Sequence, residues 1–405
     1  MEDPPNHSSP PLLQVLQALK EASHNLQANP SQHTDDANSA AIKALFELHS
    51  ESDTILSGDP NLSYLSQLLT DLKDLVESHR NTKRGLGLGS FLRRRTSAHS
   101  ISRIAGSIES EIQKWIDRES VGDLSRALRE PMRDEEELVN LLVQLEERVS
   151  LGFSREFQDL VLRLKVFPSL ESILCDPKCS KRIREHSALA IAGLIRFNKD
   201  VFVGQVLMGP TISALTSMAS PNSIQVLCSL IRSIKSPIVD EIESNGEIPK
   251  IISFLNSQDL LMKVVAMDCV LEIGYFGRKE AIEAMLKEGL IEKLIELQRS
   301  ELGGDLIDID KHSEKEEENE EERGVSVGGV VEKGKRESRQ RRFLQNHPFA
   351  SCVARFAVQL EVGEGLRQRE RRAFKQEILS RVREASISDA ESATIVAEVL
   401  WGSSP

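Results

Sequence analysis

Three side chains near the middle of the chain are of types that could bind a metal ion. Cys175, Cys179 and His186 offer two thiols and an imidazole within twelve residues. A structural zinc site needs four such ligands, commonly supplied as two closely spaced pairs. Because the Cys-x-x-x-Cys spacing is loose and no fourth ligand follows, the two thiols are expected to be structural, and no metal is expected.

Signatures of catalysis are missing from the sequence. The glycine-rich stretch GLGLGS at residues 85–90 lacks the Lys-Ser/Thr ending of a phosphate-binding loop and follows no strand, so it predicts a linker. Neither His-Glu-x-x-His nor Gly-x-Ser-x-Gly occurs. No Asp/Glu pair lies in a context that indicates a desolvated pocket. The sequence therefore predicts a protein that is not an enzyme and uses no cofactor.

Two carboxylates, Asp268 and Glu272, lie one helical turn apart. Side chains four residues apart share one face of a helix, so this pair could attract a basic or hydroxyl-bearing segment of a partner protein. The alternative is that both are ordinary solvated charges on a helix surface.

A basic stretch, FLRRRTS, occupies residues 91–97. Thr96 and Ser97 follow three arginines, a context that basophilic kinases favour, and a phosphate there would add about −2 charge beside those arginines. The alternative is a solvated basic loop. The same arginines, together with Lys83 and Arg84, could also contact an anionic membrane surface, so peripheral membrane contact stays open.

The strongest charge contrast lies further along the chain. Residues 301–322 contain eleven acids and two lysines, a net −9 that accounts for most of the chain's net charge of −12. Residues 333–342 are basic, which is typical of a nuclear import signal. The bases are Lys333, Lys335, Arg336, Arg339, Arg341 and Arg342. Alternatively, the basic run screens the acidic run, because the two are close in sequence.

The composition favours helices packed on helices. Of the 405 residues, 40% are hydrophobic and only 4% are aromatic, while Leu, Ile, Ala, Glu and Ser abound. The five cysteines lie in apolar helical contexts and the start of the chain resembles no secretory signal, so the expected location is the cytoplasm, the nucleus or both. No stretch predicts a transmembrane helix, and nucleic acid is not expected as a partner.

The N-terminal part predicts a small helical bundle over residues 12–118, after a disordered tail at residues 1–11. A helix is marked by apolar residues at 3–4 spacing between Ile101 and Ile116. Residues 81–99 are rich in glycine and basic residues, which predicts a flexible basic loop. The other helices are expected near residues 12–28, 40–55 and 63–80.

From residue 134 onward the sequence repeats. The segments FPSLESIL, TISALTSM, IPKIISFL and IEKLIELQ can be laid over one another, with starts 44, 37 and 43 residues apart. A longer helical pattern follows each of the first three segments, in which a small or apolar residue is followed by apolar residues four and then three positions later. Its positions are Ser187, Ile191 and Leu194, then Leu227, Ile231 and Ile234, then Ala266, Val270 and Ile273. Repeats of this length predict a solenoid, because each unit needs the next unit to cover its apolar face.

These repeats resemble the armadillo family. GEIPKIISFL is similar to the second-helix pattern Gly-x-Ile-Pro-x-Leu-x-x-Leu-Leu of that family, and REHSALAIAGLIRF and KVVAMDCVLEIG are similar to its third helix. The bundle followed by repeats looks like plant U-box-type armadillo proteins, although residues 117–134 are too few for a U-box. The resemblance implies an all-α fold, in which a helical bundle precedes a right-handed α-solenoid of armadillo repeats over residues 134–300.

The resemblance also implies a function. Armadillo arrays align their third helices along a concave groove that binds extended peptides, so the expected function is a non-enzymatic scaffold or adaptor for partner proteins. The alternative is a component of the ubiquitin pathway that has no U-box of its own. The groove is assigned to Arg184, Leu189, Gly193, Ser229, Ser233, Asp268 and Glu272.

The fourth repeat is interrupted in the sequence. Residues 301–345 hold the acidic and basic runs and are expected to form a disordered surface insertion. Residues 346–400 then supply a final repeat helix and capping helices with a charged outer face.

Overall fold

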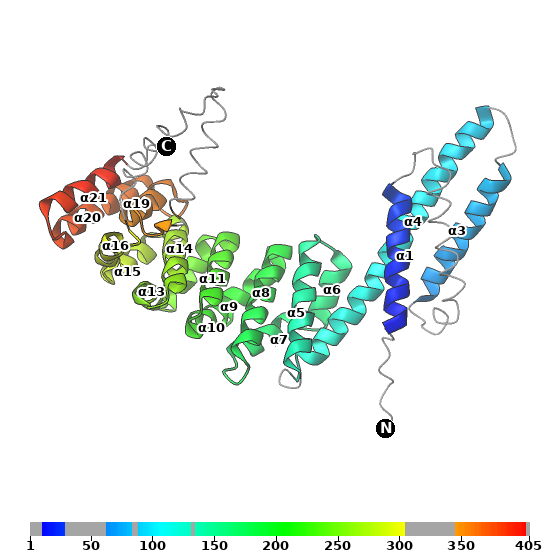
Figure 1. Ribbon diagram of the computed structural model, residues 1–405, viewed down its shortest axis with the longest axis horizontal. Helices are drawn as coiled ribbons and strands as arrows, with labels where there is room; N and C mark the ends of the chain where they lie inside the picture. Colours follow the sequence, from blue (N-terminus) through cyan, green and yellow to red (C-terminus); the bar gives the residue numbers. More distant parts are fainter. Residues whose placement is uncertain are drawn as a thin grey trace, which may run out of the picture. The chain divides into compact units, whose positions relative to one another are not determined.

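The computed structural model describes residues 10–28, 62–82, 88–130, 134–303, 344 and 346–401 (Figure 1). These residues form helices, turns and connecting segments, and no strand occurs among them. The chain divides into two compact units, Met1–Leu145 with Ser154–Val166 and Glu146–Phe153 with Phe167–Pro405. The helix predicted near residues 40–55, most of the predicted tail and nearly all of the predicted insertion lie outside the described residues.

The first unit is built around one long helix. The 40-residue α4 (Leu88–Ala127) contacts α1 (Pro10–Ala28), α3 (Ser63–Thr82) and α6 (Arg155–Arg163). Apolar stripes at 3–4 spacing on α1, α3 and α4 form the core. The buried members are Leu16, Leu19, Leu62, Leu65, Leu68, Leu69, Leu72, Ala105, Ile108, Ile112 and Trp115. This arrangement is the predicted helical bundle.

The loop predicted over residues 81–99 is wrong at residues 81–82 and 88–99, because α3 ends at Thr82 and α4 begins at Leu88, while residues 83–87 lie outside the described part. Leucine and arginine are good helix formers, and after Leu88 only Gly89 opposes a helix before residue 97. Thr96 and Ser97 therefore lie within α4 and not in a loop. At its other end α4 continues beyond residue 118, since Val121 and Leu124 extend its buried stripe.

The second unit repeats a pattern of two short helices followed by a longer one. Its first repeat ends with α7 (Val166–Cys175) and α8 (Lys181–Phe197), and α5 (Glu135–Ser150) belongs to this unit only from Glu146 onward. The second repeat consists of α9 (Lys199–Met208), α10 (Thr211–Met218) and α11 (Pro221–Ile234). The third consists of α12 (Ser236–Ser244), α13 (Ile248–Ser253) with η2 (Phe254–Asn256), and α14 (Leu260–Phe276). The fourth consists of α15 (Lys279–Lys287), α16 (Leu290–Arg299) and α19 (Cys352–Val362).

The predicted repeat pattern is confirmed by the burial of its residues. Every position of the +4, +3 signature in the third helices, from Ser187 to Ile273, is buried. Neighbouring third helices contact one another in the order α8, α11, α14 and α19, so each covers an apolar face of the next (Figure 1). The chain is therefore an all-α protein whose second unit is a solenoid of three-helix repeats of the armadillo type.

The glycine that recurs between the first and second helices of two repeats has a conformational cause. Gly246 and Gly289 have φ angles of +68° and +72°. L-residues adopt this left-handed region only at a cost, whereas glycine enters it freely. In both repeats the glycine N–H donates to a carbonyl three residues earlier, that of Glu243 or Leu286. The repeated letter therefore marks a repeated tight turn.

The two ends of the insertion are held together at the last repeat. Gln298, at the end of α16, donates from Nε2 to Oε2 of Glu398 at 2.9 Å. Ser351, next to the start of α19, donates from Oγ to the other oxygen of the same buried carboxylate at 2.5 Å. Glu398 belongs to the terminal helix α21 (Asp389–Trp401), which packs with α20 (Gln368–Ala385) as the end of the array.

Candidate partner-binding surface

The third helices begin with side chains that satisfy their free N–H groups. Ser180 Oγ accepts from the N–H of Ile183, Ser220 forms a reciprocal capping box with Ser223, and Asp259 accepts from the N–H of Leu261. Such caps stabilise a helix start by about 0.5–2 kcal/mol. They fix where α8, α11 and α14 begin, and so fix the register of the side chains that these helices present.

Polar side chains link the third helices to one another, and we call the surface they form the third-helix face. Asn222 of α11 donates to Glu185 of α8 at 2.9 Å. Two helical turns further along, Arg196 of α8 donates to Ser229 of α11 at 3.5 Å. The next link joins α11 to α14. The third-helix face comprises Glu185, Leu189, Arg196, Asn222, Gln225, Ser229, Arg232, Asp268, Glu272 and Arg355.

The two carboxylates of α14 have cationic neighbours. Arg232 Nε lies 2.9 Å from Glu272 Oε1, and the arginine side chain is 57% exposed. Burial raises the pKa of Glu272, and Arg232 acts against this rise. Burial likewise raises the pKa of Asp268, while Arg355 of α19 and Arg232 act in the opposite direction. Asp268 and Glu272 are thus members of a network of both signs and do not form an isolated acidic patch.

Part of the groove predicted from the sequence points elsewhere. Arg184 donates from Nε to the carbonyl of Leu174 at 2.9 Å, so it caps the end of α7. Gly193 is buried, and a Cβ there would lie 3.1 Å from the Val149 side chain, so it permits a close approach to α5. Ser233 donates its hydroxyl to the carbonyl of Ser229 within its own helix at 2.9 Å. Arg184 and Gly193 are thus engaged in contacts within the fold, whereas the place of Ser233 in a groove stays a prediction.

The remaining predicted positions lie on the third-helix face. Leu189, Ser229 and Glu272 are half-buried, and the side chain of Asp268 is exposed in part while packed neighbours still reduce the water around its carboxylate. Sequence reasoning missed Arg196, Arg232 and Arg355, which supply the positive charges. The signal was present in α11, because Asn222, Gln225, Ser229 and Arg232 follow one another at +3, +4 and +3 and so mark a polar stripe.

The residues considered as metal ligands contact different neighbours. His186 lies with Nδ1 3.8 Å from Oε1 of Glu146, whereas Cys179 contacts Asp176. Burial raises the pKa of both Cys175 and Cys179, which keeps these thiols protonated. In the part of the chain that the structure describes, no group of three or more His, Cys, Asp or Glu residues is placed to hold a metal ion.

Other predicted features are only partly covered. The side chains of Thr96 and Ser97 and all of residues 333–342 lie outside the described part. Across the described helices, none is by itself long and apolar enough to cross a membrane, and one bent pair, α9 with α10, reaches that length and composition.

No protein-family model matches the sequence, and a search of curated proteins finds no match either. Among solved structures, the chain is similar to a designed armadillo repeat protein at 13% identity and a TM-score of 0.40, covering 68% of this chain and 99% of that one. A computationally designed armadillo repeat protein for modular peptide recognition matches at 15% identity and a TM-score of 0.40, covering 69% and 98%. Because these scores are low, the assignment of the fold rests on the order and packing of the helices described above.

Proposed function

We propose that this chain is a non-enzymatic scaffold that binds an extended segment of a partner protein along the third-helix face. The observation that supports this proposal is the continuous row of polar contacts that runs from α8 through α11 to α14. Packed helices lie about 8–10 Å apart, and an extended chain advances about 3.3 Å per residue. Each repeat would therefore meet about three residues of a bound segment.

A charged ligand could replace ion pairs that the third-helix face forms within itself. Arg232 and Glu272 form an ion pair near the surface, and such exposed pairs contribute only about 0–1 kcal/mol. A basic side chain of a partner can replace Arg232 at Glu272 without a large penalty, and an acidic side chain can do the same in reverse at Arg232. The ligand we propose is accordingly a polar segment that carries a basic group opposite α14.

The test begins with peptides selected from a random library on the full chain, whose affinity is then measured on variants. Asp268→Lys with Glu272→Lys should weaken binding of a selected basic peptide by at least about tenfold, a loss of about 1.4 kcal/mol. The matched control is Glu280→Lys with Glu283→Lys, which makes the same change of charge at two exposed positions on α15 and should leave affinity unchanged.

If the α14 double variant binds the peptide as tightly as the unaltered chain, the third-helix face is not the binding surface. If the control variant weakens binding equally, the effect is one of general charge, and the proposal fails for that reason.

A further inference from the structure

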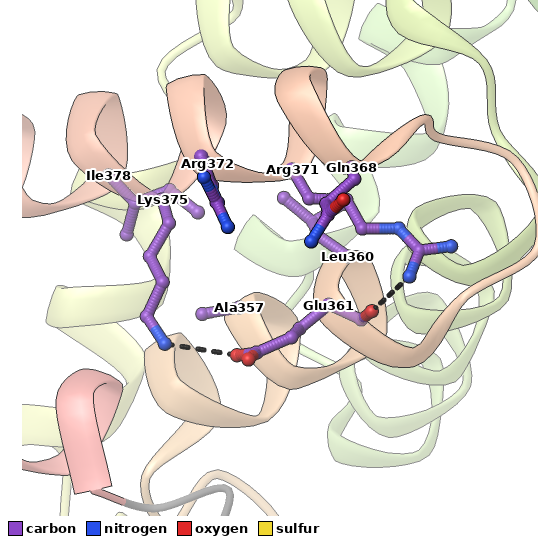
Figure 2. A pocket seen from close by; sticks show the side chains of 8 residues that line it. All are labelled: Ala357, Leu360, Glu361, Gln368, Arg371, Arg372, Lys375 and Ile378. Carbon is purple, nitrogen blue, oxygen red and sulfur yellow. Dashed lines mark hydrogen bonds and ion pairs between the residues drawn. The ribbon is translucent and has the colours of Figure 1, made fainter.

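A pocket of about 350 Å³ lies between α19 and α20, at the end of the array (Figure 2). Side chains of opposite character line it. Ala357, Leu360 and Ile378 are apolar and buried. Glu361, Gln368, Arg371, Arg372 and Lys375 are polar or charged.

Only part of the positive charge around the pocket is used within the fold. Arg371 donates to the carbonyls of Glu361, Gly363 and Leu366 at 2.6–3.0 Å, so it joins α20 to the preceding turn. Lys375 Nζ lies 2.9 Å from Glu361 Oε2. Figure 2 shows Lys375 and Arg372 both extending from α20 toward α19. Among the described residues, Arg372 has no hydrogen-bond or ion-pair partner.

This combination defines the chemistry of a ligand. The apolar side chains favour an aliphatic group, because burying it removes apolar surface from water. The two cations at the rim, opposed by a single carboxylate, favour an acidic group beside it. The pocket therefore suits a peptide in which aliphatic and acidic side chains alternate.

The chain itself contains such a segment, and it begins next to this part of the fold. Residues 305–310 read DLIDID and follow α16 after five residues. Just before them, the carbonyl of Leu302 accepts from the N–H of Phe349 at 3.2 Å, so the segment starts beside the residues that lead into α19. The acidic run at residues 314–322 offers no aliphatic side chain.

The length of the connection is compatible with this occupant. Eleven residues separate Phe349 from Leu360, and at about 1.5 Å per helical residue they span roughly 17 Å. Five or six extended residues at about 3.3 Å each cover the same distance. Residues from 307 onward can therefore reach the level of Leu360 from Leu302.

We propose that the segment 305–310 docks into the pocket between α19 and α20, with its aliphatic side chains against Leu360 and Ile378 and its aspartates toward Arg372 and Lys375. The segment thereby competes with any acidic peptide of another protein for this site. This proposal is independent of ligand binding on the third-helix face.

The test measures the affinity of a fluorescent peptide, GDLIDIDK, for the full chain and for its variant Leu306→Asn with Ile307→Asn. A tethered segment competes at a millimolar effective concentration, so the variant should bind the peptide at least about fivefold more tightly. Equal affinity would mean that the pocket accepts such peptides only from other molecules, and no binding to either chain would mean that it accepts none. Either result overturns the proposal.

A second comparison locates the binding in the pocket. In the variant with Leu306→Asn and Ile307→Asn, the further substitution Arg372→Glu should lower the affinity for the peptide at least about tenfold. It removes one charge-assisted contact and places a negative charge there instead. The matched control is Arg369→Glu, an exposed position on the same helix that does not line the pocket. Equal effects of the two substitutions would show attraction to α20 in general and would refute the docking site.

Discussion

One substitution made at two glycines should change stability in opposite directions. Gly246, in the turn between α12 and α13, has a φ angle of +68°, and nothing lies within 4 Å of the position of an added Cβ. Gly204, within α9, also has open space around that position, and its φ angle is not in the left-handed region. Steric crowding is thus absent at both sites, and the backbone alone decides the outcome.

The magnitudes follow from the conformation of each residue. A left-handed alanine costs about 1–2 kcal/mol, and the loss of freedom in the unfolded chain returns about 0.4–1 kcal/mol. Gly246→Ala should therefore destabilise the fold by about 1 kcal/mol. Gly204→Ala should stabilise it by up to about 1 kcal/mol, because alanine is the better helix former. The two variants should differ by about 2 kcal/mol.

The assay is urea unfolding of the full chain followed by far-ultraviolet circular dichroism, with hydrogen exchange in α12 and α13 as a local readout. Gly246→Ala should lower the unfolding midpoint and speed exchange in these two helices, and Gly204→Ala should raise the midpoint. A higher midpoint for Gly246→Ala would refute the assignment of the left-handed turn, and a lower midpoint for Gly204→Ala would refute the open helical position given to Gly204.

Two further outcomes are expected. Burial raises the pKa of Glu146 to about 7, opposed by Arg196 and reinforced by Glu147. The folded chain then binds more protons than the unfolded chain between about pH 4.5 and 7, so stability falls as the pH rises through that window. Glu146→Gln should raise the free energy of unfolding at pH 8 by up to about 3 kcal/mol and make it depend less on pH. Urea unfolding midpoints measured at pH 5 and pH 8 test this. A variant whose midpoint falls between these pH values as much as that of the unaltered chain would contradict it. Leu255 is 1% exposed, and Leu255→Ala should cost about 2–5 kcal/mol in the free energy of unfolding, whereas Leu260→Ala, at a position 45% exposed, should change it by about 0.5 kcal/mol or less.

The solenoid could be predicted from the sequence because its apolar positions recur with the repeat. The segment beginning at Thr211 coincides with α10, and the predicted third-helix stripes are buried throughout. The start of α4 was mispredicted because glycines before Leu88 were given more weight than the helix formers after it. Periodicity identifies a packed face well and the end of a helix poorly.

The candidate surface was harder to predict, since its contacts join different helices. Spacing placed Arg184 near the groove, but its hydrogen bond to Leu174 crosses a turn that periodicity does not describe. The ion pair of Arg232 with Glu272 joins residues forty positions apart. The pocket between α19 and α20 depends on how two helices meet after the insertion, which no local pattern in the sequence specifies.

The carboxylate of Glu398 should allow the fourth repeat to keep its packing when the length of the insertion changes. Its two oxygens accept hydrogen bonds from Gln298, before the insertion, and from Ser351, after it. Helix α21 therefore holds the chain on both sides of the insertion. In general, doubling a connecting segment costs only about 0.6 kcal/mol in closure entropy. A foreign domain or a reporter spliced between residues 322 and 333 should accordingly be carried without disturbing the repeats, which makes this junction a natural place for the chain to acquire or lose sequence.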